Sequence, residues 1–193
     1  MRRNLTPYVC SHAATKLAML AVCGYGLTPH AFAAKEKRAG TVSELRITVA
    51  VIDFAHVAVE TRTRAEREAG RILASAGITV LWVDIDPDSP TELPVRAIVL
   101  RLEPPAGPKH DPKAIGVALA PDTGDGFYAT IFFDRVRERA ADTVLIETGA
   151  NLGTVMGHAI AHEIGHLLLG TNSHSGSGLM SAVWTASELR CLA

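Results

Sequence analysis

Residues 158–170 read HAIAHEIGHLLLG, and this stretch decides how the rest of the chain can be interpreted. His162 and His166 are four residues apart, so on a helix they lie on one face, about one turn apart. Both imidazoles can therefore reach a single metal ion. Glu163 directly follows the first histidine and can project toward a water molecule on that ion. The stretch thus predicts a helix that carries a metal site.

The chemistry of such a site points to hydrolysis. Zinc prefers nitrogen ligands in a tetrahedral arrangement, and a catalytic zinc site keeps one position open for water. The metal lowers the pKa of that water, and a neighbouring glutamate can take its proton. A short motif can arise by chance on a surface helix, but four of the eight histidines fall between positions 158 and 174. We therefore expect zinc-dependent hydrolysis of peptide bonds.

The pattern around this helix predicts an α/β fold. The helix itself is expected to begin after Asn151, a good N-cap residue, and to end at Gly170. Periodicity and turn residues predict strands over 45–57, 78–84, 95–103, 115–121 and 126–134, and helices over 59–76 and 134–142. The first strand–helix–strand unit favours a right-handed parallel crossover. We expect a mixed twisted sheet packed on helices (α/β, or α+β), with one helix carrying the active site.

The segment HEIGHLLLGTNSHSGSGLM (162–180) resembles the metzincin zinc peptidases, and most of all their matrixin branch. On this resemblance Gly170 is the glycine that turns the chain, and Met180 is the methionine of the turn under the metal. Glu163 matches the general base. The resemblance implies that one catalytic zinc is held by three histidines, namely His162, His166 and His174. It also implies a metzincin-like zincin catalytic domain.

Upstream, the segment GVALAPDTGDGFYATIFFD (116–134) is similar to the edge strand of that family and the strand after it. In the family the edge strand binds the substrate backbone in antiparallel orientation. The resemblance thus implies substrate binding by Val117, Ala118, Leu119 and Ala120. Matrixins carry a histidine for a structural zinc in this strand, and these four residues include none. We therefore expect a single zinc ion. The N-terminal half agrees with the family only in its strand–helix–strand order.

The spacing before the third histidine departs from the family pattern. The family places its glycine three residues after the second histidine and its third histidine six after, whereas here Gly170 is four after and His174 eight after. The third ligand thus has a rival in Glu188, which follows His166 by 22 residues, a spacing similar to that of thermolysin-like enzymes. His158, one turn before His162, is expected to pack or hydrogen-bond near the site rather than bind the metal.

The N-terminal residues have the features of an export signal. Two arginines and a lysine precede an apolar stretch at 17–27, and no acidic residue occurs before position 34. Small residues at Ala31 and Ala33 place the cleavage after Ala33. We expect residues 1–33 to be a signal peptide that directs the protein to the periplasm or the exterior. Lipoprotein anchoring at Cys23 is less favoured, because Val22 is larger than the residue usual before such a cysteine.

The remaining chain is expected to comprise a flexible lead-in over 34–43 and a zinc metallopeptidase domain over 44–193. The net charge is only −1, which argues against a nucleic-acid partner. The sequence contains no run of 18 apolar residues, so we expect no stable membrane span after signal cleavage. The expected partner is a peptide or protein substrate, and the oligomeric state does not follow from the sequence.

Taken together, these features predict an exported zinc-dependent endopeptidase in which Glu163 assists the attack of a zinc-bound water on the peptide bond. The alternative is a catalytically weak or inactive zinc-binding module of the same fold that binds peptides or partners. The intact Glu163 favours the enzyme, because a site that only binds has no need of the base. A third hypothesis is a membrane-associated protein built on the apolar segment 17–27.

Overall fold

The structure is a computed structural model that describes residues 45–89, 92–104, 111, 113–119, 127–141, 151–182 and 184. Several sequence predictions lie outside the described residues: the signal peptide 1–33, the lead-in 34–43, Ala120 and Glu188. All described elements belong to one unit of the chain, residues 43–193.

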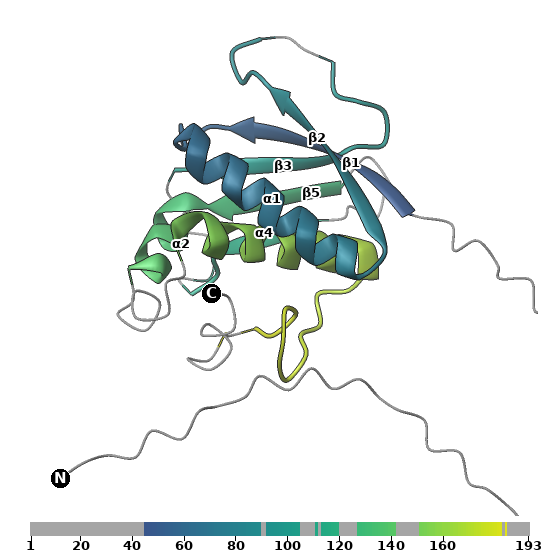
Figure 1. The fold of residues 1–193 in the computed structure, drawn as a ribbon, viewed down its shortest axis with the longest axis vertical. Helices are drawn as coiled ribbons and strands as arrows, with labels where there is room; N and C mark the ends of the chain where they lie inside the picture. The colour runs from purple at the N-terminus through teal and green to yellow at the C-terminus, as the bar shows by residue number, and fades with distance from the viewer. Residues whose placement is uncertain are drawn as a thin grey trace, which may run out of the picture. The chain divides into compact units, whose positions relative to one another are not determined.

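Five strands form a mixed sheet in the order β2-β1-β3-β5-β4 (Figure 1). Their bounds are β1 Leu45–Asp53, β2 Ile78–Ile85, β3 Ile98–Glu103, β4 Gly116–Leu119 and β5 Phe127–Phe132. The strands β2, β1, β3 and β5 are parallel to one another, and β4 pairs antiparallel with β5 at the edge. The predicted α/β class and the mixed sheet are thus confirmed.

The first strand is shorter than the sequence pattern predicts, and the cause is local. It ends at Asp53 rather than at Val57. The carboxylate of Asp53 accepts hydrogen bonds from the backbone N–H groups of Ala55 at 3.1 Å and Val57 at 2.9 Å. An aspartate that binds the backbone a few residues ahead turns the chain out of the sheet. Residues 54–57 therefore do not extend the strand.

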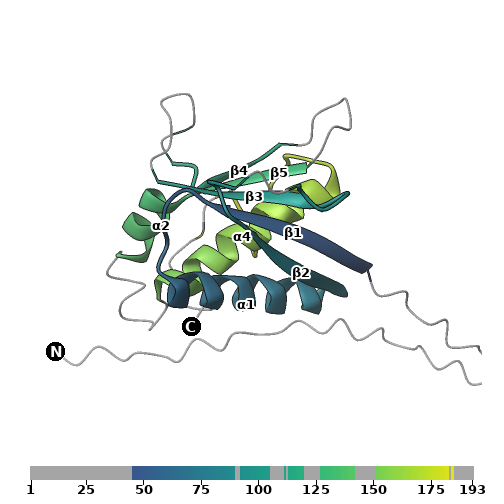
Figure 2. The same ribbon diagram turned by 90° about the horizontal axis from the view of Figure 1, so that it is seen from above.

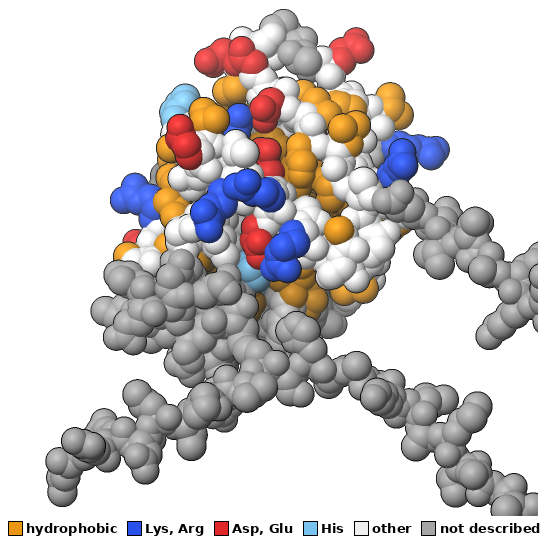
Figure 3. Space-filling view, in the orientation of Figure 1, with side chains coloured by type: hydrophobic (Ala, Val, Ile, Leu, Met, Phe, Trp, Pro, Cys, Tyr) orange, Lys and Arg blue, Asp and Glu red, His pale blue; other side chains and the backbone are white. Residues whose placement is uncertain are grey.

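The two long helices, α1 (Val59–Ser75) and α4 (Leu152–Leu169), lie against the same face of the sheet (Figure 2). A third helix, α2 (Phe133–Ala140), follows β5 directly. Helix α1 is amphipathic and buries Ala65, Ala69 and Leu73. Its outer face carries the exposed charged side chains Glu60, Arg64, Arg67 and Arg71, and blue and red side chains mix over this helix in Figure 3.

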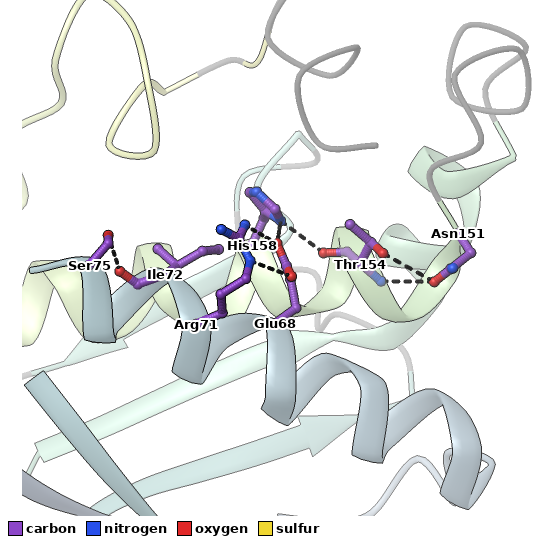
Figure 4. A network of polar contacts seen from close by, with 7 residues as sticks. All are labelled: Glu68, Arg71, Ile72, Ser75, Asn151, Thr154 and His158. Carbon is purple, nitrogen blue, oxygen red and sulfur yellow. Dashed lines mark hydrogen bonds and ion pairs between the residues drawn. The ribbon is translucent and has the colours of Figure 1, made fainter. Parts of the chain in front are cut away.

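Helix α4 is buried on almost every side, as expected for a helix that is apolar all round. Its predicted boundaries are confirmed. The side chain of Asn151 accepts a hydrogen bond from the backbone N–H of Thr154 at 3.0 Å, which caps the first turn (Figure 4). Gly170 ends the helix with a left-handed φ of 62°, a conformation that glycine adopts without strain. Among the described residues, no helix is long and apolar enough to cross a membrane.

Helices α1 and α4 touch through their backbones, because glycine stands where they meet. A Cβ atom on Gly157 would lie 2.7 Å from the carbonyl oxygen of Ala65 and 2.7 Å from Cβ of Glu68. A Cβ on Gly153 would lie 2.9 Å from Cβ of Arg64. These distances are shorter than van der Waals contact, so any larger residue would push the helices apart. The two glycines therefore set the position of α4 against α1.

We predict that Gly157→Ala destabilises the protein by about 1–3 kcal/mol, because the backbone of α1 cannot move aside as a flexible side chain would. The matched control is Gly70→Ala in α1, where a Cβ would meet only Nε1 of Trp82, at 3.8 Å. That change should stabilise the helix by about 0.5–1 kcal/mol through propensity. Denaturant unfolding measures both. Equal stability of the two variants would contradict the packing argument.

Candidate metal centre

Three histidines converge on one point beside the sheet. His162 and His166 project from α4, and His174 comes from the segment that follows the helix. One ring nitrogen from each histidine lies within 4.8 Å of those from the other two, and the Nε2 atoms of His162 and His166 are 3.0 Å apart. The two helix histidines are buried, whereas His174 is exposed. The structure thus brings together the three residues that the resemblance implies as ligands, and together they could hold a metal ion.

The two helix histidines have their other ring nitrogens occupied. Nδ1 of His162 donates to the carbonyl oxygen of Leu179 at 2.7 Å, and Nδ1 of His166 donates to that of Thr171 at 2.8 Å. A carbonyl oxygen only accepts, so Nδ1 carries the proton and Nε2 of a neutral ring keeps a lone pair. Two lone pairs directed at each other across 3.0 Å favour a cation between them. This donor set fits a metal that prefers nitrogen ligands.

Burial also keeps His162 in the form that a metal binds. The cost of removing its charged form from water lowers the pKa of His162, and the neighbouring imidazoles of His166 and His174 lower it further. The hydrogen bond to Leu179 acts in the opposite direction. A lowered pKa favours the neutral ring at neutral pH, and only the neutral ring can donate a lone pair to a metal.

Glu163 is buried between α4 and the edge strand. Its side chain faces Gly116 of β4, where a Cβ atom would lie 2.7 Å from Oε1 of the glutamate. Burial raises the pKa of Glu163 to about 8. A cation nearby favours the ionised form and lowers that pKa.

Met180 packs directly under the helix that carries the two histidines. A Cβ atom on Gly165 would lie 2.7 Å from Sδ of Met180, so the methionine reaches the helix backbone only because residue 165 is glycine. The backbone N–H of Ser175 donates to the carbonyl oxygen of Met180 at 2.8 Å, which closes the chain between them. Sequence reasoning singled out Met180 but missed Gly165. A glycine inside a helix lowers helix propensity, and that was the available signal.

A cleft of about 710 Å³ runs past the histidines and is bordered by β4, by α2 and by the segment after α4. The carbonyl oxygen of Ile115 accepts from the backbone N–H of Phe132 at 3.0 Å, and pairing alternates along an antiparallel ladder. The backbones of Val117 and Leu119 therefore face β5. Those of Gly116 and Ala118 face away from β5, toward the outer edge of the strand.

This register shows which residues of the predicted substrate strand direct their backbone groups outward. Of the four residues that the resemblance implied, Val117 and Leu119 have their backbone groups directed into the sheet, and Ala118 has them directed outward. Gly116 was not in the predicted set, although it lines the cleft next to Glu163. Local sequence patterns did not indicate that this position must be glycine, because a Cβ atom there is excluded by Glu163 on α4 and by the carbonyl oxygen of Thr130 on β5, which only the fold brings together.

His158 lies outside the group of converging histidines. Its Nδ1 donates to the carbonyl oxygen of Thr154 at 3.0 Å and lies 3.7 Å from Oε1 of Glu68, which a bidentate contact with Arg71 holds in place (Figure 4). Its ring stands edge-on to Trp184, with centroids 6.1 Å apart. Burial lowers the pKa of His158. Its place beside the site, in a contact between α1 and α4, agrees with the predicted role.

Comparisons with known proteins give one distant structural likeness. No family model matches the chain, and no curated protein is similar to it. Among solved structures, metalloproteinase-II from Bacteroides fragilis is similar with a TM-score of 0.45 and 14% sequence identity. The match covers 75% of this chain and 48% of that protein, so the chain spans about half the length of the protein that it matches.

Proposed function

We propose that this chain is a zinc-dependent endopeptidase with a metzincin-like catalytic site. The observation that carries the proposal is the convergence of His162, His166 and His174 in the same cleft as the buried carboxyl group of Glu163. Three imidazole ligands leave room for a fourth position, as in catalytic rather than structural zinc sites. The matrixin branch remains a prediction that rests on the sequence resemblance.

Zinc and Glu163 have different roles in the proposed reaction. When bound, zinc supplies a Lewis acid that polarises the scissile carbonyl, lowers the pKa of water and favours the ionised form of Glu163. Glu163 accepts the proton of the attacking water and returns a proton to the leaving amine, as a general base and then a general acid. Burial raises the pKa of Glu163 whereas a bound cation would lower it, so the two effects act on the base in opposite directions.

The edge strand β4 would hold the substrate. Gly116 and Ala118 direct their backbone N–H and C=O groups to the outer edge, where an extended peptide can pair in antiparallel orientation. Because Gly116 touches Glu163, a peptide bound there passes beside the general base. Recognition through the backbone suits an enzyme that cleaves within peptide chains, because each residue of a peptide offers the same groups.

The alternative is a zinc-binding module of the same fold that binds peptides without cleaving them. It would use the same histidines and the same edge strand. The position of Glu163 favours the enzyme, because burial of a carboxyl group without a paired cation costs stability and needs a compensating role. Export through residues 1–33 remains a prediction from the sequence.

We predict that His174→Ala lowers zinc affinity by more than about 100-fold. Removal of a residue that only hydrogen-bonds a metal ligand already lowers metal affinity by about 10–100-fold. Competition with a chromophoric chelator measures the affinity. His174 is exposed, so its replacement should leave folding intact. The control is His56→Asn, because His56 is exposed, lies outside the cluster and has a φ of 51° that asparagine tolerates. Unchanged zinc affinity in His174→Ala, together with lowered zinc affinity in Glu188→Ala, would assign the third ligand to Glu188.

We predict that Glu163→Gln retains zinc but lowers peptide hydrolysis by at least about 100-fold, because the amide cannot accept the proton of water. A peptide library cleaved in the presence of zinc provides the assay. Glu138→Gln is the matched control, because Glu138 is an exposed acid at the border of the same cleft and should leave the rate unchanged. A wild type that holds zinc and binds peptides but cleaves none would support the binding module instead.

We predict that Gly116→Ala lowers kcat/KM and leaves zinc affinity unchanged. The added Cβ would meet Oε1 of Glu163 at 2.7 Å and the carbonyl oxygen of Thr130 at 2.9 Å, so either the base or the edge strand must move. None of the three histidines is involved. The control is Gly176→Ala, where a Cβ meets nothing within 4 Å. Full activity of Gly116→Ala would contradict the proposed contact between base and substrate strand.

A further inference from the structure

The segment that carries His174 has little packing of its own. Residues 171–178 are all exposed. The backbone N–H of Thr171 donates to the carbonyl oxygen of His166 at 3.3 Å. Side chains of α4 hold the segment at two carbonyl oxygens, those of Thr171 and Leu179, which accept from the Nδ1 atoms of His166 and His162. The position of His174 therefore depends on how firmly these two carbonyl groups are held.

A second side chain binds one of these carbonyl groups. Nε1 of Trp184 donates to the carbonyl oxygen of Leu179 at 3.3 Å, so this oxygen accepts from both Trp184 and His162. The indole ring stands edge-on to the ring of His162, with centroids 6.1 Å apart at 87°. Trp184 is itself anchored, because the residue is only 8% exposed and its carbonyl oxygen accepts from Nη2 of Arg139 on α2 at 3.0 Å.

We propose that Trp184 is a positioning residue for the metal centre, acting through the carbonyl oxygen of Leu179. A carbonyl oxygen has two lone pairs, and here two donors occupy them. The oxygen is therefore held where it fixes the tautomer and the ring orientation of His162. The same bond fixes the end of the exposed segment that carries His174. This inference rests on the metal site of the proposed function but not on peptide hydrolysis.

The competing role is ordinary core packing, because Trp184 also belongs to the main hydrophobic cluster. The two roles differ in the atom that matters. Packing needs the bulk of the ring, whereas positioning needs the N–H donor. Trp184→Phe keeps much of the aromatic bulk and removes the donor. The chain offers a matched control in Trp82, its only other tryptophan, which lies on β2 at the sheet edge opposite β4.

The experiment measures zinc affinity by chelator competition in the wild type, Trp184→Phe and Trp82→Phe. We expect about tenfold weaker binding in Trp184→Phe alone, the scale of the loss when a partner of a metal ligand is removed. The visible absorption bands of bound Co²⁺ should also change in Trp184→Phe, because they report ligand geometry. Wild-type affinity and wild-type Co²⁺ bands in a folded Trp184→Phe would overturn the inference. A wild type that binds no zinc would instead overturn the proposed function.

A second measurement covers the case in which Trp184→Phe does not fold. In Trp82→Phe the emission comes from Trp184 alone, so its fluorescence reports directly on this indole. Saturation with Zn²⁺ should shift that emission with a stoichiometry of one ion per chain and the midpoint found by chelator competition. Emission that is unchanged at full zinc occupancy would show that Trp184 is not coupled to the site, and would also overturn the inference.

Discussion

The Nδ1 hydrogen bonds of His162 and His166 connect α4 with the segment that follows it. Each imidazole thereby has two tasks, since one ring nitrogen holds the chain and the other remains available to a ligand. The carbonyl acceptors are Leu179 and Thr171, on either side of His174. Because that segment is exposed, these bonds, more than burial, decide where the third histidine lies.

Three close approaches across glycine position the helix that makes these bonds. Gly157 sets the distance from α4 to α1, Gly165 admits the sulfur of Met180, and Gly116 on β4 admits the carboxyl group of Glu163. In each case a Cβ atom would fall at 2.7 Å from its neighbour. At Gly157 the Cβ would meet backbone of α1, which cannot move aside, whereas at Gly165 and Gly116 the side chain of Met180 or Glu163 would have to shift. The site thus depends on the absence of a Cβ atom at these three positions as well as on its polar side chains.

The buried carboxyl group of Glu163 gives this arrangement a functional meaning. Burial of a carboxyl group raises its pKa and costs stability, and the cost is larger where no cation pairs with it. A metal ion held by the three histidines would provide that positive charge beside a base and an edge strand. The proposed peptidase accounts for all three features together. A binding module accounts for the histidines and the strand, but it leaves the buried Glu163 without a purpose.

Local spacing was enough to predict part of this protein. The i, i+4 relation of His162 and His166, the cap at Asn151 and the end at Gly170 all follow from helix geometry, so the sequence by itself determined the helix and its pair of histidines. The order of strands and helices could be predicted for the same reason, because hydrophobic periodicity and turn residues are local features of the sequence.

Only the tertiary structure decided the remainder. The longer spacing to His174 left its position open, and it reaches the cluster because the chain between is tied to α4. The need for glycine at position 116 depends on Glu163, which is 47 residues away. Likewise, the place of Trp184 beside Leu179 depends on the hydrogen bond to its carbonyl oxygen from Arg139 on α2, 45 residues away. Such contacts follow from packing between distant segments, which local residue patterns do not encode.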